Sequence, residues 1–196
     1  RSSAASDVYK RQGLYVKDLN HIYVSSYVYS GLMRVDTTCH IIQKIPYGIT
    51  SKGYNVLPSY TPSSHPYIAP VIIDKKIYIT QNAIDRFHPI VDTPLSVVID
   101  TVQKSCEDLP LTYGILTEKE LAIKDPRFSR VFNGKEFIYS FYVSEDIVVT
   151  SVDHSEVKKI SVKSKYLDSP IVKQEVSERG PQLNLELARY GDLIYD

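Results

Sequence analysis

The chain has 196 residues, and its 23 basic and 23 acidic side chains give a formal net charge of zero. Proteins that bind nucleic acids usually carry a basic excess, because neutralising phosphates supplies much of their affinity. No apolar run approaches the roughly 18 residues that a membrane-spanning helix needs. Composition therefore argues against nucleic-acid binding and against a membrane span. The length suffices for one domain with a sizeable core, or for two small domains.

The first twelve residues differ from the rest of the chain. Residues 2–12, SSAASDVYKRQ, resemble the translation of one frame of a transposon-derived adaptor that is used in DNA sequencing libraries. Segments left by processing are set aside before the fold is considered. We therefore expect residues 1–12 to be foreign and residues 13–196 to form a single β-rich domain. The match also indicates a gene assembled from environmental DNA.

The first half of the chain predicts strands followed by a long loop. Residues 21–30 (HIYVSSYVYS) are rich in β-branched and aromatic residues, and residues 32–35 and 38–45 continue in extended form. Residues 46–70 then hold five prolines, two glycines and four tyrosines. Loops of this length are uncommon in compact domains unless they are functional or disordered, and the tyrosines argue against disorder.

The tyrosines of this loop are the predicted interaction residues. They are Tyr47, Tyr54, Tyr60 and Tyr67. Tyrosine offers a large contact area and loses little side-chain entropy when it binds, which suits a recognition surface. The alternative, which stays open, is that the rings pack back onto their own sheet.

The middle of the chain predicts one hairpin and several helices. Residues 71–80 (VIIDKKIYIT) are two apolar runs around a polar turn, which indicates a hairpin. Short helices are expected at residues 81–87 and 117–123, the latter with Thr117 and Glu120 as a capping box. The strongest helix prediction covers residues 93–107, with an N-cap threonine, a proline at the first helical position and an apolar stripe at helical spacing.

The last third predicts a strand meander. A hairpin is expected around Asn133-Gly134 with a type I′ turn, followed by strands at residues 147–152 and 159–163 and a helix at 183–190. No internal sequence repeat is visible. The fold class is therefore α+β: a mainly antiparallel sheet of hairpins and a C-terminal meander, with two or three short helices and the long Tyr/Pro-rich loop. A boundary near residues 108–126 is the two-domain alternative.

Two local motifs and two distant cysteines contain reactive residue types. Asp153-His154-Ser155 has the residues of a hydrolase triad, but consecutive residues cannot form such a relay, so a polar turn is the better explanation. Cys39 and His40 would point to opposite faces of a strand and could not act as a pair. We expect Cys39 and Cys106 to be reduced and buried, because a free cysteine packs as a small hydrophobic residue.

Metal, cofactor and small-molecule sites are not predicted. The five histidines are His21, His40, His65, His88 and His154, and none shows the close spacing of zinc ligands. The acidic pairs at 107–108, 118/120 and 145–146 fall at expected helix ends or turns. The eight glycines form no phosphate-binding loop.

The leading hypothesis is a non-enzymatic structural or protein-interaction protein that binds protein partners or copies of itself. Its specific form is a bacteriophage virion component, such as a ring, connector or tail-associated subunit, a choice that rests on the AT-rich environmental origin alone. One alternative is a hydrolase whose site is assembled from His40, His88 or His154 with acidic residues or Cys39. A second alternative is a fragment of a larger protein, which predicts an uncovered apolar surface near Gly13. The sequence indicates no cellular compartment.

Overall fold

The computed structural model describes residues 11–26, 31–53, 70–81, 89–122 and 128–162. The chain divides into two compact units, Arg1–Ile115 and Leu116–Asp196. The division falls within the segment 108–126 that the sequence offered as an alternative boundary, and each unit is described by itself below.

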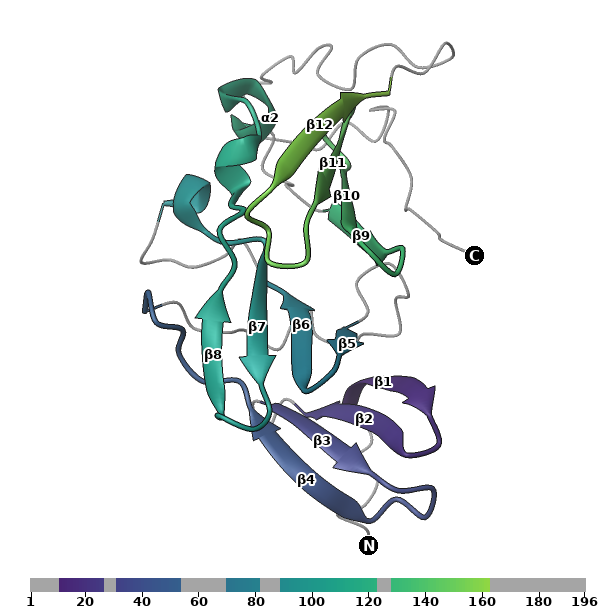
Figure 1. Ribbon diagram of the computed structural model, residues 1–196. Coiled ribbons are helices and arrows are strands. Elements are labelled where there is room, and N and C mark those ends of the chain that lie inside the picture. Colours follow the sequence, from purple (N-terminus) through teal and green to yellow (C-terminus); the bar gives the residue numbers. More distant parts are fainter. Residues whose placement is uncertain (1–10, 27–30, 54–69, 82–88, 123–127, 163–196) are drawn as a thin grey trace, which may run out of the picture. The chain divides into compact units, whose positions relative to one another are not determined.

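The first unit begins with a four-stranded antiparallel sheet, which we call sheet 1. Its strands are β1 (Arg11–Asp18), β2 (His21–Ser26), β3 (Gly31–Val35) and β4 (Ile41–Pro46). They pair in chain order, each with the next (Figure 1). Strands were expected for β2, β3 and β4 but not for β1. The β4 strand begins later than residue 38, because residues 36–40 form a turn held by the Asp36 side chain.

Sheet 2 follows in the same unit. Its strands are β5 (Val71–Ile73), β6 (Lys76–Thr80), β7 (Ser96–Asp100) and β8 (Ser105–Asp108), again paired in chain order. The hairpin predicted over residues 71–80 is confirmed, with Asp74 in the left-handed region at φ 52°. Asp and Asn tolerate that region better than most residues, which suits Asp74 to the turn.

The helix predicted over residues 93–107 is wrong, because this segment forms the β7–β8 hairpin. Leu95, Val97 and Ile99 are all buried, and a spacing of two residues places them on one face of a strand. After β7 the Asp100 carboxylate accepts hydrogen bonds from two backbone N–H groups of the turn, at 2.8 and 2.9 Å. Leu95 and Ile99 also fit a helical stripe with Val98, Val102 and Cys106, so the spacing alone did not distinguish the two structures.

Sheets 1 and 2 share one hydrophobic core. Buried side chains from both sheets form a single cluster, and Tyr15, Ile72 and Cys106 pack against it. The members of the cluster are Tyr23, Leu32, Ile45, Tyr47, Ile77, Ile79, Val97 and Ile99. The two sheets therefore pack face to face, as in other layered β structures.

Two short 3₁₀ turns complete the first unit, one between β6 and β7 and one after β8. They are η3 (Ile90–Asp92) and η4 (Tyr113–Ile115). A single antiparallel bridge joins Pro94 to Thr112 beside them.

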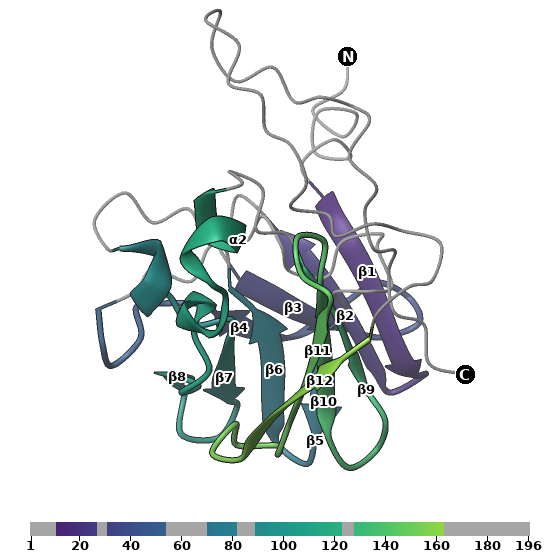
Figure 2. The same cartoon turned by 90° about the horizontal axis from the view of Figure 1, so that it is seen from above.

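The second unit holds a short helix and sheet 3. The helix is α2 (Glu118–Ala122), the short coil labelled in Figure 2. The strands are β9 (Phe128–Phe132), β10 (Phe137–Phe141), β11 (Asp146–Thr150) and β12 (Val157–Ser161), in an antiparallel meander. The predicted capping box is confirmed, since the Glu120 carboxylate accepts from the N–H and hydroxyl of Thr117, both at 2.7 Å.

The predicted β9–β10 hairpin is confirmed, but its turn is not of type I′. That turn needs two residues with positive φ, whereas only Gly134 has one here, at 92°. The side-chain oxygen of Asn133 instead accepts hydrogen bonds from the backbone of Lys135 and Glu136. Asn133 thus stabilises the turn through its side chain and does not adopt the left-handed conformation.

The described residues are mostly β, so the α+β prediction holds only in its mainly antiparallel part. They contain three four-stranded antiparallel sheets, one short helix and two 3₁₀ turns. Of the helix expected at residues 81–87 only Gln81 is described, and it is not helical; the helix expected at 183–190 lies outside the described residues. The first strands of the three sheets begin at residues 11, 71 and 128, which is a structural repeat that the sequence did not reveal.

Candidate functional site

The candidate site is the face of sheet 1 that points away from its core. Cross-strand partners lie on the same face of a sheet, and successive residues alternate between faces. Tyr23, Leu32 and Ile45 belong to the core, so the rows between them face the other way. The outer face is formed by these two rows: Leu14, Val24, Met33 and Lys44; and Val16, Ile22, Val35 and Ile41.

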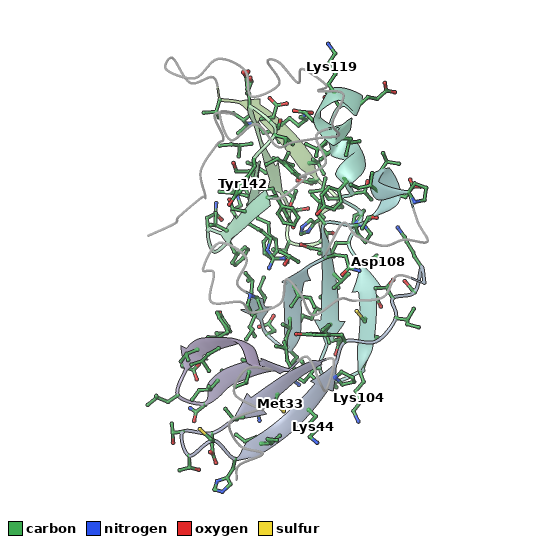
Figure 3. The ribbon with its side chains drawn as sticks, turned by 180° about the vertical axis from the view of Figure 1, so that it is seen from behind. Met33, Lys44, Lys104, Asp108, Lys119 and Tyr142 are labelled. Atoms are coloured by element: carbon green, nitrogen blue, oxygen red, sulfur yellow. The ribbon has the colours of Figure 1, made fainter. Side chains whose placement is uncertain are left out.

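The outer face is almost entirely apolar. Seven of its eight residues are hydrophobic, and Lys44 is the only charged one. Leu14, Val16 and Ile41 are 62, 52 and 51% exposed, and Val35 is buried. Figure 3 labels Met33 and Lys44, which are partners on adjacent strands. Single exposed apolar residues are ordinary, but a contiguous group on one sheet face marks an interaction surface.

A polar rim borders this face at one end of the sheet. The β1–β2 and β3–β4 turns both lie at that end, because the strands run antiparallel in chain order. His21 Nδ1 is 2.9 Å from the Asp18 carboxylate, and the hydrogen bond lowers the pKa of Asp18. In the other turn the Thr38 hydroxyl is 2.7 Å from both Asp36 and the His40 ring. An apolar centre with a polar rim is the usual composition of a protein interface.

Of the four predicted interaction tyrosines, the structure describes Tyr47. It is 2% exposed and packs in the core of the first unit. For Tyr47 the structure therefore agrees with the alternative, in which the tyrosine rings pack onto their own sheet. Tyr54, Tyr60 and Tyr67 lie outside the described residues, so their role stays a prediction.

The expectation that both cysteines are buried is wrong. Cys39 is exposed and lies in the β3–β4 turn with φ 66°, because the strand starts only at Ile41. His40 is exposed beside it. Cys106 is half-buried against the core, and burial raises the pKa of its thiol to about 12. This raised pKa is the opposite of what a nucleophilic cysteine requires, because the thiolate is the reactive form.

The segment Asp153-His154-Ser155 forms a polar turn between β11 and β12, as expected. The Asp153 carboxylate accepts hydrogen bonds from the hydroxyls of Ser151 and Ser155, at 2.7 and 2.8 Å. These bonds lower the pKa of Asp153 to about 2. The three residues stabilise a turn and form no catalytic relay.

His154 itself is 1% exposed, which the sequence did not indicate. Its Nδ1 lies 3.2 Å from the Val152 carbonyl oxygen, an atom that only accepts, so Nδ1 carries the proton. Nε2 then accepts a hydrogen bond of 2.6 Å from the Tyr139 hydroxyl. Burial, with a smaller contribution from the charge of Arg130, lowers the pKa of His154 to about 4.

Arg130 is the second buried polar side chain of this network. Its guanidinium lies 5.1 Å from the centre of the Phe137 ring, within cation–π range. It is 2% exposed, and burial lowers its pKa. The network lies among core aromatic residues of sheet 3, so its direct effect is to hold the β11–β12 turn to the sheet.

Within the described residues, no group of three or more histidine, cysteine or acidic side chains could hold a metal ion. No helix in that part of the chain is long and apolar enough to cross a membrane. The outer face is therefore the strongest candidate site. In the sequence this face is indicated by apolar residues at alternating positions, namely Leu14, Val16, Ile22 and Val24. Alternation alone does not show whether the apolar face of a strand is covered by another part of the protein.

Comparison with solved structures finds a similar fold in a member of the DUF4221 family from Bacteroides vulgatus. That structure has a TM-score of 0.62 and 20% sequence identity, and the match covers 78% of this chain and 43% of that one. A virginiamycin B lyase from Staphylococcus aureus matches less well, with a TM-score of 0.44, 11% identity and coverage of 80% and 42%. This chain thus spans less than half the length of either protein.

No sequence of a curated protein is similar enough to count as a match. The family model described as "Domain of unknown function (DUF4221)" matches residues 7–196. The match begins inside residues 1–12, which the sequence predicts to be foreign, and β1 begins at Arg11. The end of the foreign segment at residue 12 therefore stays a prediction. Because the match covers nearly the whole chain, this protein belongs to the DUF4221 family.

Proposed function

We propose that the chain is a non-enzymatic structural or protein-interaction module, and that the outer face of sheet 1 is its contact surface. The observation that carries this proposal is an apolar sheet face that lies opposite the core and is left uncovered at Leu14, Val16 and Ile41. Fully burying a Leu, Ile or Val side chain contributes about 1.5–3 kcal/mol. Covering these three, which are about half exposed, would therefore contribute roughly 1 kcal/mol each.

The hydrolase alternative has less support. His40 and Cys39 are exposed in a turn of the first unit, whereas His154 is buried in the second unit with both ring nitrogens engaged. A general base needs an accessible nitrogen near its substrate. His88 lies outside the described residues. The virion hypothesis is a narrower form of the proposed function, and no observation on this chain supports it specifically.

The test is the solution mass of the chain, measured by light scattering during size exclusion across a range of concentrations. An uncovered apolar face should make the mass rise with concentration. Val16→Lys should abolish this association, whereas Val102→Lys should leave it unchanged. Val102 is the matched control, since it is 61% exposed in the β7–β8 turn and is not one of the outer-face residues. A monomer at every concentration for all three proteins would contradict the proposal.

A further inference from the structure

We infer that Asn133 is a site of spontaneous modification, at which the native turn between β9 and β10 promotes attack of the Gly134 backbone nitrogen on the Asn133 side-chain amide. This chemistry is independent of the contact surface proposed above. Its products are a cyclic imide and then an aspartyl or an isoaspartyl residue in place of the asparagine. Three features of the turn support the inference: the residue that follows the asparagine, the hydrogen bonds of its side chain, and the attacking nitrogen.

The reaction needs no cofactor and balances with water alone. A base removes the proton from the Gly134 backbone nitrogen, which then forms a bond to Cγ of Asn133. The bond from Cγ to Nδ2 breaks, and the amide group takes up a proton and leaves as ammonia. Water then opens the imide at one of its two carbonyl carbons. One opening gives an aspartyl residue, and the other gives an isoaspartyl residue, in which the main chain runs through the former side chain.

The first feature is the glycine that follows the asparagine. The chain has five asparagines, and Asn133 is the one that precedes glycine, whereas the others precede His, Val, Ala and Leu. Gly134 is exposed and has φ 92°, a conformation that residues with a side chain rarely adopt. Apart from its chain neighbours, no described atom lies within 4 Å of the point where a Cβ would stand. The nitrogen can therefore approach Cγ without steric hindrance.

The second feature is the pair of hydrogen bonds made by the Asn133 side chain. Its Oδ1 accepts from the backbone N–H groups of Lys135 and Glu136, at 2.9 and 2.8 Å. When a nitrogen adds to Cγ, negative charge develops on this oxygen, and N–H groups that already point at it stabilise that charge. The Asn133 N–H also donates to the Glu136 carbonyl oxygen at 3.1 Å, which closes the turn. The native turn thus holds both donors in place before the reaction begins.

The third feature is the attacking nitrogen. In the part of the chain that the structure describes, no hydrogen bond engages the N–H of Gly134 or the Nδ2 of Asn133. A base in water can reach the first group, and the second can leave without breaking a hydrogen bond. Asn20 lies in another exposed turn and offers the contrast, because the backbone N–H of His21 after it is bonded to the Asp18 carboxylate.

The two products would affect sheet 3 differently. The aspartyl product keeps an oxygen in the place of Oδ1, and its negative charge strengthens the hydrogen bonds to the two N–H groups. The isoaspartyl product adds a methylene group to the main chain next to Phe132, whose ring centroid is 4.8 Å from that of its cross-strand partner Phe137. Because Phe137 is fully buried, a longer main chain at this point disturbs closely packed side chains.

The test follows each asparagine of the folded 196-residue chain by peptide mass spectrometry at pH 6.5, 7.5 and 8.5. Replacement of the amide NH₂ by OH should accumulate at Asn133, about tenfold faster for each pH unit, because the reaction requires loss of the Gly134 proton. Asn20 is the internal control and should stay unmodified over the same time. Isoaspartyl residues are measured by enzymatic methylation of their carboxylate. Asn133→Ser keeps a side-chain oxygen but cannot form the imide, so this signal should disappear.

The same measurement in urea separates the effect of the turn from that of the Asn-Gly sequence. We expect the amide of Asn133 to be lost about tenfold faster in the folded chain, because unfolding removes the fixed positions of the two N–H donors. A slower loss in the folded chain than in urea, or no loss in the folded chain, would overturn the inference. Equal rates at Asn133 and Asn20 would also overturn it, because the reaction would then depend on neither the glycine nor the turn.

Discussion

The buried imidazole of His154 should make the second unit less stable below neutral pH. The pKa of a histidine in an unfolded chain is about 6.5, and burial lowers that of His154 to about 4. The unfolded state therefore binds the proton more tightly, and stability falls as the pH drops from about 6.5 towards 4. A difference of two to three pKa units corresponds to about 3 kcal/mol, because each unit is worth 1.36 kcal/mol.

The measurement is the free energy of unfolding of the second unit at pH 7.0, 5.5 and 4.5. Hydrogen exchange at the amides of β10 and β11 reports on this unit alone. His154→Asn removes the titrating ring, and asparagine tolerates the left-handed backbone of this residue, at φ 60°. The variant should be less stable than the wild type at pH 7, yet it should lose much less stability on acidification. His40→Asn, in an exposed turn of the first unit, is the control.

Two results would refute this reasoning. One is the same loss of stability in wild type and His154→Asn between pH 7.0 and 4.5. The other is a ring titration of His154, followed by NMR, with a midpoint near 6.5. Asp153 does not confuse the result, because its pKa is lowered to about 2 and its contribution to stability is lost only below about pH 4.

Three further substitutions test other parts of the fold. Thr117→Ala should destabilise α2 by about 1 kcal/mol, because it removes the side-chain cap, and hydrogen exchange at the amides of that helix should become faster. Thr117→Ser keeps the hydroxyl and should leave the exchange unchanged; equal exchange in both variants would show that the cap does not stabilise the helix. Tyr139→Phe should destabilise the second unit by about 1–3 kcal/mol, because it leaves the buried Nε2 of His154 without a hydrogen-bond donor. An unchanged midpoint of unfolding in urea would contradict this. In urea unfolding, Leu32→Ala should lower the free energy of unfolding by about 2–5 kcal/mol, because Leu32 is fully buried. Leu14→Ala on the outer face should change it by less than about 0.5 kcal/mol. Similar losses would mean that the outer face is covered in the free chain.

Features that depend on a few neighbouring residues could be predicted from the sequence. The hairpin at residues 71–80, the capping box at Thr117 and the polar turn at Asp153 are all present. Each is determined by turn chemistry or capping, in which a side chain bonds to backbone groups within about four residues. Such interactions form in the same way whatever the rest of the chain does.

Features that depend on distant segments were decided by the tertiary structure. Residues 96–108 became two strands because β7 pairs with β6, from a separate part of the chain, although the same apolar spacing fits a helix. The burial of Tyr47 and His154 likewise follows from sheets packing around them. The strand character of β2 was visible in the sequence, but only packing against sheet 2 leaves Leu14 and Val16 of the neighbouring β1 uncovered. Local preference sets which conformations a segment can adopt, and burial against remote residues selects among them.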